Sequence, residues 1–153
     1  MTRTKSKNFD SIAILIIAVS ALVVSIWQVN LTRAHNRLTV RPYLDIDFKF
    51  ESAAILTIKN KGEGAAVVDS FHLEMNGQKF SDWKALFANM GDDITPPISR
   101  TFDDKDIIGA SEELILCSLP LNVPKKVQIV IVIDYKSIYD EPFQFRNNFS
   151  WGG

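Results

Sequence analysis

Small and polar side chains recur on one side of an otherwise apolar segment near the N-terminus. The uncharged run extends from Ile12 to Val29. At heptad spacing, small side chains let helix backbones approach closely, and polar ones can hydrogen-bond across the contact or line a water-accessible path. The seam that this spacing predicts, with its continuation beyond the apolar run, consists of Ile14, Ala18, Ala21, Ser25, Gln28, Thr32 and His35.

This seam predicts self-association in a membrane. Lipid supplies no hydrophobic force between helices, so close packing and polar contacts must drive their association. Gln28 and His35 strengthen the interpretation, because a polar side chain near lipid is costly unless it faces a partner or water. Three or more copies would form a polar ring, gated by the apolar level at Ile14. The alternative is a passive anchor in which the small residues coincide by chance.

Three arginines follow the apolar run at intervals of four residues. Arg33, Arg37 and Arg41 are expected on one face of a continuing helix, nearly opposite the seam. If the seam faces inward, these side chains face outward and contact lipid phosphates. A specific anionic ligand or a regulatory partner is the alternative.

No other group of residues has the spacing of a catalytic or metal site, so we expect no enzyme activity, no cofactor and no metal. Cys117 is the only cysteine and is predicted to be a buried apolar residue. His72 is predicted to be exposed on the polar side of a strand. The acidic residues around Asp92 and Asp103 lack the glycine and spacing of a calcium-binding loop, which favours solvated turns. The loop KNKGEG is interpreted as a β-turn that needs positive φ.

The elements that carry these residues divide the chain into three parts. We expect a basic tail over residues 1–10, a transmembrane helix with a juxtamembrane stem over 11–41, and a β-domain over 42–153. The uncharged run is about 27 Å long at helical rise, close to the hydrocarbon thickness. It ends beside Trp27, an interfacial residue type, and no A-x-A-type cleavage site follows it. We therefore interpret it as a retained single span.

Period-two alternation begins after Pro42 and places Leu44, Ile46, Phe48 and Phe50 on one face of a strand. Further strands are expected in AAILTIKN, VVDSFHLEM, SRTF, EELILCSL, VQIVIVIDY and PFQFRNNFSW. Asn76-Gly77 predicts a hairpin. SDWKALFANMG predicts a short helix, capped by Ser81, ended by Gly91, and apolar at Trp83, Leu86, Phe87 and Met90. This pattern predicts an antiparallel immunoglobulin-like β-sandwich with one short inserted helix.

The charges are divided unequally between these parts. Up to Arg41, six Lys and Arg residues against one Asp give +5, whereas 11 basic and 17 acidic residues from Pro42 onward give −6. The basic part fits a position beside lipid headgroups. The acidic β-domain argues against nucleic-acid binding by that domain alone.

Two stretches, HNRLTVRPYLDIDF and LTIKNKGEGAAVV, resemble a class of small bacterial membrane proteins with one N-terminal span and an HNRLxVRPxL-like juxtamembrane segment. IVIDYKSIYDEPFQF resembles the same class, with Asp140 where glycine is usual. In the earlier loop, Ala65 follows Gly64 where proline is common. The resemblance implies a single-span protein of the bacterial inner membrane with a β-sandwich, and transfers no catalytic residue. The layout is also similar to membrane-disrupting effectors of bacterial anti-phage defence.

Two functions are consistent with these features. The first is a homo-oligomeric, channel-like or membrane-disrupting effector whose β-domain gates the assembly. The second is a membrane-tethered adaptor whose β-domain binds another protein, either around His72 and Glu74 or at a free edge strand. Lys and Arg counts on the two sides of the span are equal and leave its orientation open. The single cysteine and the effector layout favour a cytoplasmic β-domain.

Overall fold

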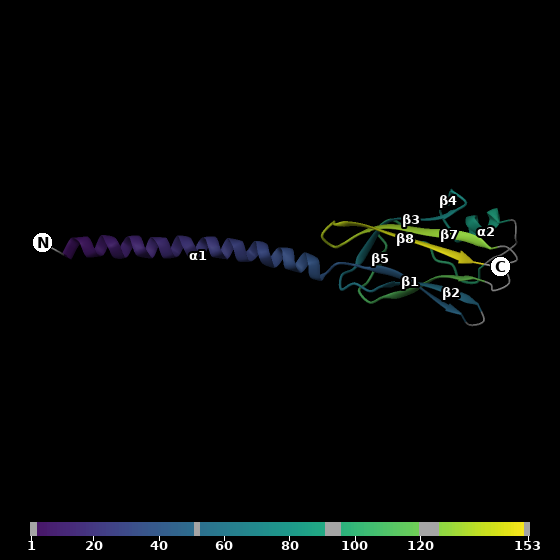
Figure 1. Cartoon of the computed structure of the whole chain (residues 1–153), viewed down its shortest axis with the longest axis horizontal. Helices are drawn as coiled ribbons and strands as arrows, with labels where there is room; N and C mark the ends of the chain where they lie inside the picture. The colour runs from purple at the N-terminus through teal and green to yellow at the C-terminus, as the bar shows by residue number, and fades with distance from the viewer. Residues whose placement is uncertain (1–2, 51–52, 91–95, 120–125, 152–153) are drawn as a thin grey trace. The chain divides into compact units, whose positions relative to one another are not determined.

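A computed structural model describes residues 3–50, 53–90, 96–119 and 126–151 of the chain and, within the first helix, the side chains from Ser11 onward (Figure 1). The chain divides into two compact units, Met1–Thr39 and Val40–Gly153. The first unit is a helix and the second is a β-domain. Each unit is described by itself.

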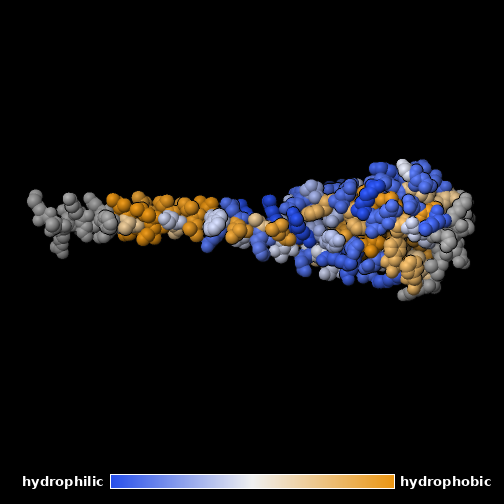
Figure 2. Space-filling model, viewed as in Figure 1, coloured by the Kyte–Doolittle hydropathy of each residue, from blue (hydrophilic) through white to orange (hydrophobic). Residues whose placement is uncertain are grey.

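The first unit consists of helix α1 (Arg3–Thr39), which is 37 residues long. From Ser11 to Thr39 the helix is long and apolar enough to cross a membrane, and the rest of the chain buries none of its apolar window. Figure 2 shows a continuous hydrophobic band along this helix. The predicted apolar N-terminal helix is therefore confirmed. The helix ends at Thr39, as expected from Pro42, because proline disfavours helical geometry in the residue before it.

The second unit contains two antiparallel sheets, which confirms a mainly-β domain. The three-stranded sheet has the order β1-β2-β6, and the other sheet has the order β4-β3-β7-β8, with β5 paired to β3. The strands of the first sheet are β1 (Leu44–Phe50), β2 (Ala54–Asn60) and β6 (Glu113–Leu119). Those of the second are β3 (Ala66–Met75), β4 (Gln78–Phe80), β5 (Ile107–Ile108), β7 (Val127–Lys136) and β8 (Pro142–Trp151).

The two sheets share one hydrophobic core. Alternate residues of β2 and β7 are buried between the sheets, as the period-two pattern requires. The largest fully buried side chains come from both sheets and from the short helix: Trp83, Phe87, Leu56, Ile58, Leu73, Leu86, Ile108, Leu116, Leu119, Ile129, Ile131 and Ile133. These side chains fix the relative position of the sheets and therefore of the loops at both ends.

The turn between β3 and β4 has the geometry that its sequence, Asn76-Gly77, predicts. Asn76 and Gly77 have φ values of 51° and 80° and connect β3 to β4. Both residues of a type I′ turn need positive φ, which asparagine and glycine tolerate best. The predicted hairpin is confirmed.

The inserted helix α2 (Trp83–Asn89) forms where predicted, with a different cap. Trp83, Leu86 and Phe87 are buried and Met90 packs partly against the core. Asp82, not Ser81, caps the helix: its carboxylate accepts a hydrogen bond from the Ala85 amide at 2.7 Å. The Ser81 hydroxyl instead donates to that carboxylate. The predicted stop at Gly91 lies outside the described residues.

This cap gives a simple stability prediction. Asp82→Ala removes the acceptor for the Ala85 amide and is expected to lower the free energy of unfolding by about 1 kcal/mol. Ser81→Ala, the matched control, should change it by less than about 0.5 kcal/mol. Chemical unfolding of the full chain in detergent measures both values. Equal losses in the two variants would contradict the assignment of the cap.

The predicted strand SRTF is wrong. Within the described residues this segment makes one isolated bridge, from Ser99 to Cys117. The Arg100 carbonyl accepts a hydrogen bond from the Trp83 indole at 3.0 Å, and Phe102 turns into the core. Because the Trp83 indole occupies the Arg100 carbonyl, the backbone pairing of this segment with β6 does not continue beyond the Ser99–Cys117 bridge. The chain then forms β5, which the sequence analysis did not anticipate.

Candidate functional site

The predicted seam lies entirely on α1, and all of its residues are exposed. The Ser25 hydroxyl donates to the Ala21 carbonyl at 2.8 Å, so it is already satisfied within its own helix. Its contribution to a helix contact would therefore come from its small size. The described part of the chain offers the Gln28 amide no hydrogen-bond partner. Gln28 is therefore the seam residue with the strongest need for one.

The three arginines do not share one environment. Arg33 and Arg37 lie on α1, one turn apart, and are exposed. Arg41 lies beyond the helix, which corrects its predicted place on the same helical face. Its guanidinium is 5.7 Å from the centroid of the Phe143 ring, and its Nε is 3.7 Å from a Glu141 carboxylate oxygen. The β-domain therefore holds Arg41, and only Arg33 and Arg37 remain on the stem.

The loop after β2 holds the entry segment, Val40–Tyr43, by which the chain enters the β-domain. Asn60, at the end of β2, is fully buried. Its side-chain oxygen accepts hydrogen bonds from the amides of Tyr43 (3.1 Å) and Gly62 (3.0 Å). Its side-chain nitrogen donates to the carbonyls of Gly64 (2.8 Å) and Ile108 (3.1 Å). One amide therefore ties the entry segment to the β2–β3 loop and to the β5 edge.

The two glycines of this loop serve close approach and not positive φ, which corrects the predicted turn. Neither glycine is among the residues with positive φ. A Cβ on Gly64 would lie 1.7 Å from the Val40 carbonyl oxygen, and one on Gly62 would lie 2.2 Å from the Arg41 oxygen. The Lys61 amide also donates to the Tyr43 carbonyl at 2.7 Å. The missing side chains let the loop backbone lie directly on the entry segment.

A polar network covers part of the outer face of the β3-β7-β8 sheet. His72 was expected to be exposed, but only 21% of its side chain is exposed, and it lies 3.4 Å from Glu74. Arg146 donates to Glu74 at 2.7 Å, and this hydrogen bond is the main reason why the pKa of Glu74 lies below its ordinary value. Arg146 on β8 reaches Glu74 on β3 across the intervening strand β7, whereas His72 and Glu74 lie on the same strand. The Arg146–Glu74 pair therefore ties β3 to β8 on the outer face of the sheet.

The remaining titratable candidates also lack reactive geometry. Cys117 is fully buried as predicted, and desolvation raises its pKa to about 12, so its thiol is inert at neutral pH. Asp103, Asp104 and Asp106 are exposed, whereas Asp92 lies outside the described residues. Among the described residues, no group of three His, Cys, Asp or Glu side chains could hold a metal ion.

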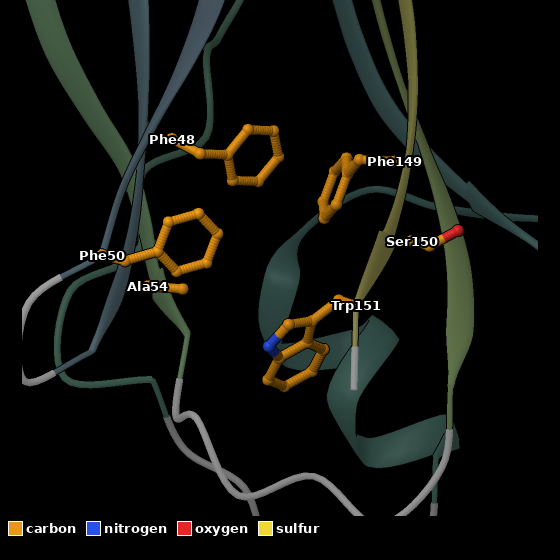
Figure 3. A pocket seen from close by; sticks show the side chains of 6 residues that line it. All are labelled: Phe48, Phe50, Ala54, Phe149, Ser150 and Trp151. Atoms are coloured by element: carbon orange, nitrogen blue, oxygen red, sulfur yellow. The ribbon is translucent and has the colours of Figure 1, made fainter. Parts of the chain in front are cut away.

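An aromatic cavity opens between the edge strands β1 and β8. It has a volume of about 190 Å³ and is lined by Phe48, Phe50, Ala54, Phe149, Ser150 and Trp151 (Figure 3). The sequence placed Phe48 and Phe50 on the same face as the core residues Leu44 and Ile46, yet Phe50 is 73% exposed. Alternation assigns a face to a side chain but does not say how far the opposite sheet covers it. The cavity is therefore a feature that sequence analysis missed.

Comparison with known families assigns the chain. The family model described as "Domain of unknown function (DUF8453)" matches residues 9–151. The chain belongs to the DUF8453 family. No curated protein matches it. The DUF8453 match covers the apolar helix together with the β-domain, so both units are parts of the family pattern.

Three features of the described residues mark the candidate functional site of this DUF8453 chain. The apolar helix presents the exposed Gln28 amide on the predicted seam, without a hydrogen-bond partner among the described residues. The entry segment is fixed to the β-domain by Asn60 and the two loop glycines. The aromatic cavity lies at the edge where both sheets end. These three places are the candidate functional site.

Proposed function

We propose that this chain is a non-enzymatic membrane protein that assembles through α1 and whose β-domain controls a leak path at the helix contact. Copies meet along the seam, and the ring formed by Ser25, Gln28, Thr32 and His35 admits water and ions when it opens. Loss of the ion gradient would serve a membrane-disrupting effector of bacterial defence. This layout resemblance is the only support for the defence role.

The observation that carries the proposal is the unpartnered Gln28 amide on a helix that no other part of the chain covers. An amide near lipid gains a hydrogen bond when a second helix brings its own polar residue to the same level. Ala21 and Ser25 lie one turn apart on the same seam and let the backbones approach. A hydrogen bond between two copies of Gln28 therefore becomes accessible without a bulky side chain in the way.

The entry segment supports control by the β-domain. Thr39 ends α1, and Tyr43 is already bonded to Asn60 and Lys61, so few residues separate the helix from fixed β structure. A long flexible linker would absorb a movement of the domain, whereas a short and fixed one passes it to the helix. We place the β-domain on the cytoplasmic side of a bacterial inner membrane. Labelling of an engineered surface cysteine in intact cells tests that side, and labelling from outside would contradict it.

Replacing the seam residues tests the proposal. The double variant Ser25→Leu/Gln28→Leu should lose the oligomer in mild detergent and the ion leak in reconstituted vesicles, each by about tenfold or more, because a loss of about 1.4 kcal/mol changes association tenfold. Ser20→Leu is the matched control, since Ser20 lies off the seam and its hydroxyl bonds to the Ile16 carbonyl as Ser25 bonds to Ala21. Mass measurement and dye or potential assays report the two properties. Unchanged mass and leak in the double variant would refute the proposal.

We infer further that the β-domain is an immunoglobulin-like sandwich. Its sheet orders support this: β1-β2-β6 corresponds to strands A, B and E, and β3-β7-β8 corresponds to C, F and G. The chain crosses between the sheets after β2, after β5 and after β6, as in Greek-key sandwiches. A solved structure with a different crossing pattern would overturn this assignment.

The aromatic cavity favours a tethered adaptor as the second candidate function. An apolar pocket at an open sheet edge can receive a hydrophobic side chain of a protein partner. In that case α1 is only an anchor. The Ser25→Leu/Gln28→Leu variant would then retain full activity, whereas Phe50→Glu would abolish it.

A further inference from the structure

Two edge strands lie on the same side of the β-domain, and among the described residues neither has a strand neighbour on that side. β1 ends the order of one sheet and β8 ends the order of the other. They are not hydrogen-bonded to each other, and the aromatic cavity lies between them (Figure 3). In β8 (Pro142–Trp151), the backbone amides and carbonyls that point away from β7 therefore remain available to a further strand.

The two edge strands also run in the same direction and at matched levels. Near their beginnings, Arg41 contacts Glu141 and Phe143. Farther along, the rings of Phe48 and Phe149 are 5.1 Å apart. Phe50 and Trp151 then face each other across the cavity (Figure 3). The same spacing places Asp45 of β1 at the level of Arg146 of β8, and Asp47 at the level of Asn148.

Because β1 and β8 run in the same direction at matched levels, two copies of the β-domain can pair through this edge by a two-fold rotation. A two-fold axis that runs along the strands, midway between the two sheets, carries β1 of one copy to a place beside β8 of the other. Strand direction and level are preserved, so each β8 gains a parallel neighbour. Inner faces meet inner faces, and the aromatic cavities of both copies join. The entry segments of both copies point the same way, as two chains anchored in one membrane require.

The charges along this contact are compatible with pairing. On the outer face, Asp45 of one copy comes beside Arg146 of the other, and Asp47 beside Asn148. No like charges are opposed, which would destabilise a strand pair. Elsewhere the β-domain carries a net charge of −6 from Pro42 onward and repels its copies. The cavity has no charged lining residue, so two copies can approach there without that penalty.

We propose that the β1/β8 edge is a docking surface for a second copy of this chain, with each β8 pairing in parallel beside β1 of the other copy. The inference rests on the proposed function, because association of α1 supplies the second copy at high local concentration. Parallel pairing is weaker per residue than antiparallel pairing, so the edge contact depends on that tether. It closes the assembly through the β-domains, and its rupture is the opening step.

A cross-link between two different chains tests the contact. One full-length chain carries Asp47→Cys and the other carries Asn148→Cys, with separate tags, and both are produced together and extracted in mild detergent. Neighbouring strands lie about 4.8 Å apart, within the Cα separation that a disulfide spans. Mild oxidation should give the mixed dimer. The native Cys117 adds no background because it is buried and its pKa is raised. Ile115→Cys on β6 replaces Asp47→Cys as the control and should give no mixed dimer with Asn148→Cys.

A second variant separates this contact from helix association. Phe50→Glu places a charge in the joined cavity and should reduce the mixed dimer about tenfold, while the mass of the detergent-extracted assembly stays unchanged. Ile107→Glu, which places the same charge at an exposed isoleucine of β5, should change neither. If the Asp47→Cys and Asn148→Cys chains with Phe50 intact keep the full assembly mass but give no cross-link, the docking surface is overturned and the seam proposal stays intact. A cross-link that persists when the seam variant keeps its full mass overturns the seam and leaves the docking surface intact.

Discussion

Asn60→Leu is expected to lower the free energy of unfolding of the β-domain by at least about 3 kcal/mol. The leucine is similar in size, but it removes every polar contact of a fully buried side chain. The amides of Tyr43 and Gly62 then lose their acceptor, and the carbonyls of Gly64 and Ile108 lose their donor. Each buried group left without a partner costs about 1–3 kcal/mol, and solvent entry at the loop offsets part of that cost.

Unfolding of the full chain in detergent measures this effect. In a Trp27→Phe background, the tryptophan signal comes from the β-domain, through Trp83 and Trp151. Asn89→Leu is the matched control, because Asn89 is exposed on α2 and the chemical change is identical. Asn60→Asp keeps the acceptor and should be less harmful than leucine only at acidic pH, where the buried carboxyl is neutral. If Asn60→Leu and Asn89→Leu unfold at the same denaturant concentration, the assigned role of Asn60 is wrong.

The sequence predicted the strands where burial alternates and the helix where apolar residues have helical spacing. Both signals are local, so β1, β2, β3, β7 and β8 were found near their true positions. The same signals failed where a distant residue decides the outcome. The strand expected in SRTF is interrupted because the Trp83 indole takes the Arg100 carbonyl. Asp82 caps α2 in place of the predicted Ser81. Both residue types are good N-caps, so the local sequence does not distinguish between them.

The candidate site was harder to predict because its parts come from separate segments. The motif N-x-G-x-G was visible, but its meaning depends on what lies against Gly62 and Gly64, and the entry segment is about 20 residues away in sequence. A polar residue at the end of an apolar strand, followed by two spaced glycines, was the available signal. Asp140 gives a second example, because its φ of 58° lies in the region that favours glycine.

The close approach at Gly64 carries the second large expected effect. Gly64→Ala places a methyl group 1.7 Å from the Val40 carbonyl oxygen, a separation that no rotamer change can relieve because both partners are backbone. The loop and the entry segment must move apart, which also lengthens the Asn60 hydrogen bond to the Gly64 carbonyl. We expect a loss of about 3 kcal/mol or more in the free energy of unfolding, in the range of severe overpacking. Gly109→Ala is the control, because its nearest contact would be the flexible Glu112 carboxylate at 3.2 Å.

The same variant links the fold to the proposed control of α1. If the loop holds the entry segment, Gly64→Ala should raise amide hydrogen exchange at Val40 and Tyr43 before the core strands exchange, since local opening needs less free energy than global unfolding. In vesicles it should then alter the leak while the seam, and therefore the mass of the assembly, is retained. Gly109→Ala should alter neither exchange nor leak. Faster exchange at the entry segment with an unchanged leak would show that the loop stabilises the β-domain without acting on the helix, and control would then have to reach α1 by another route.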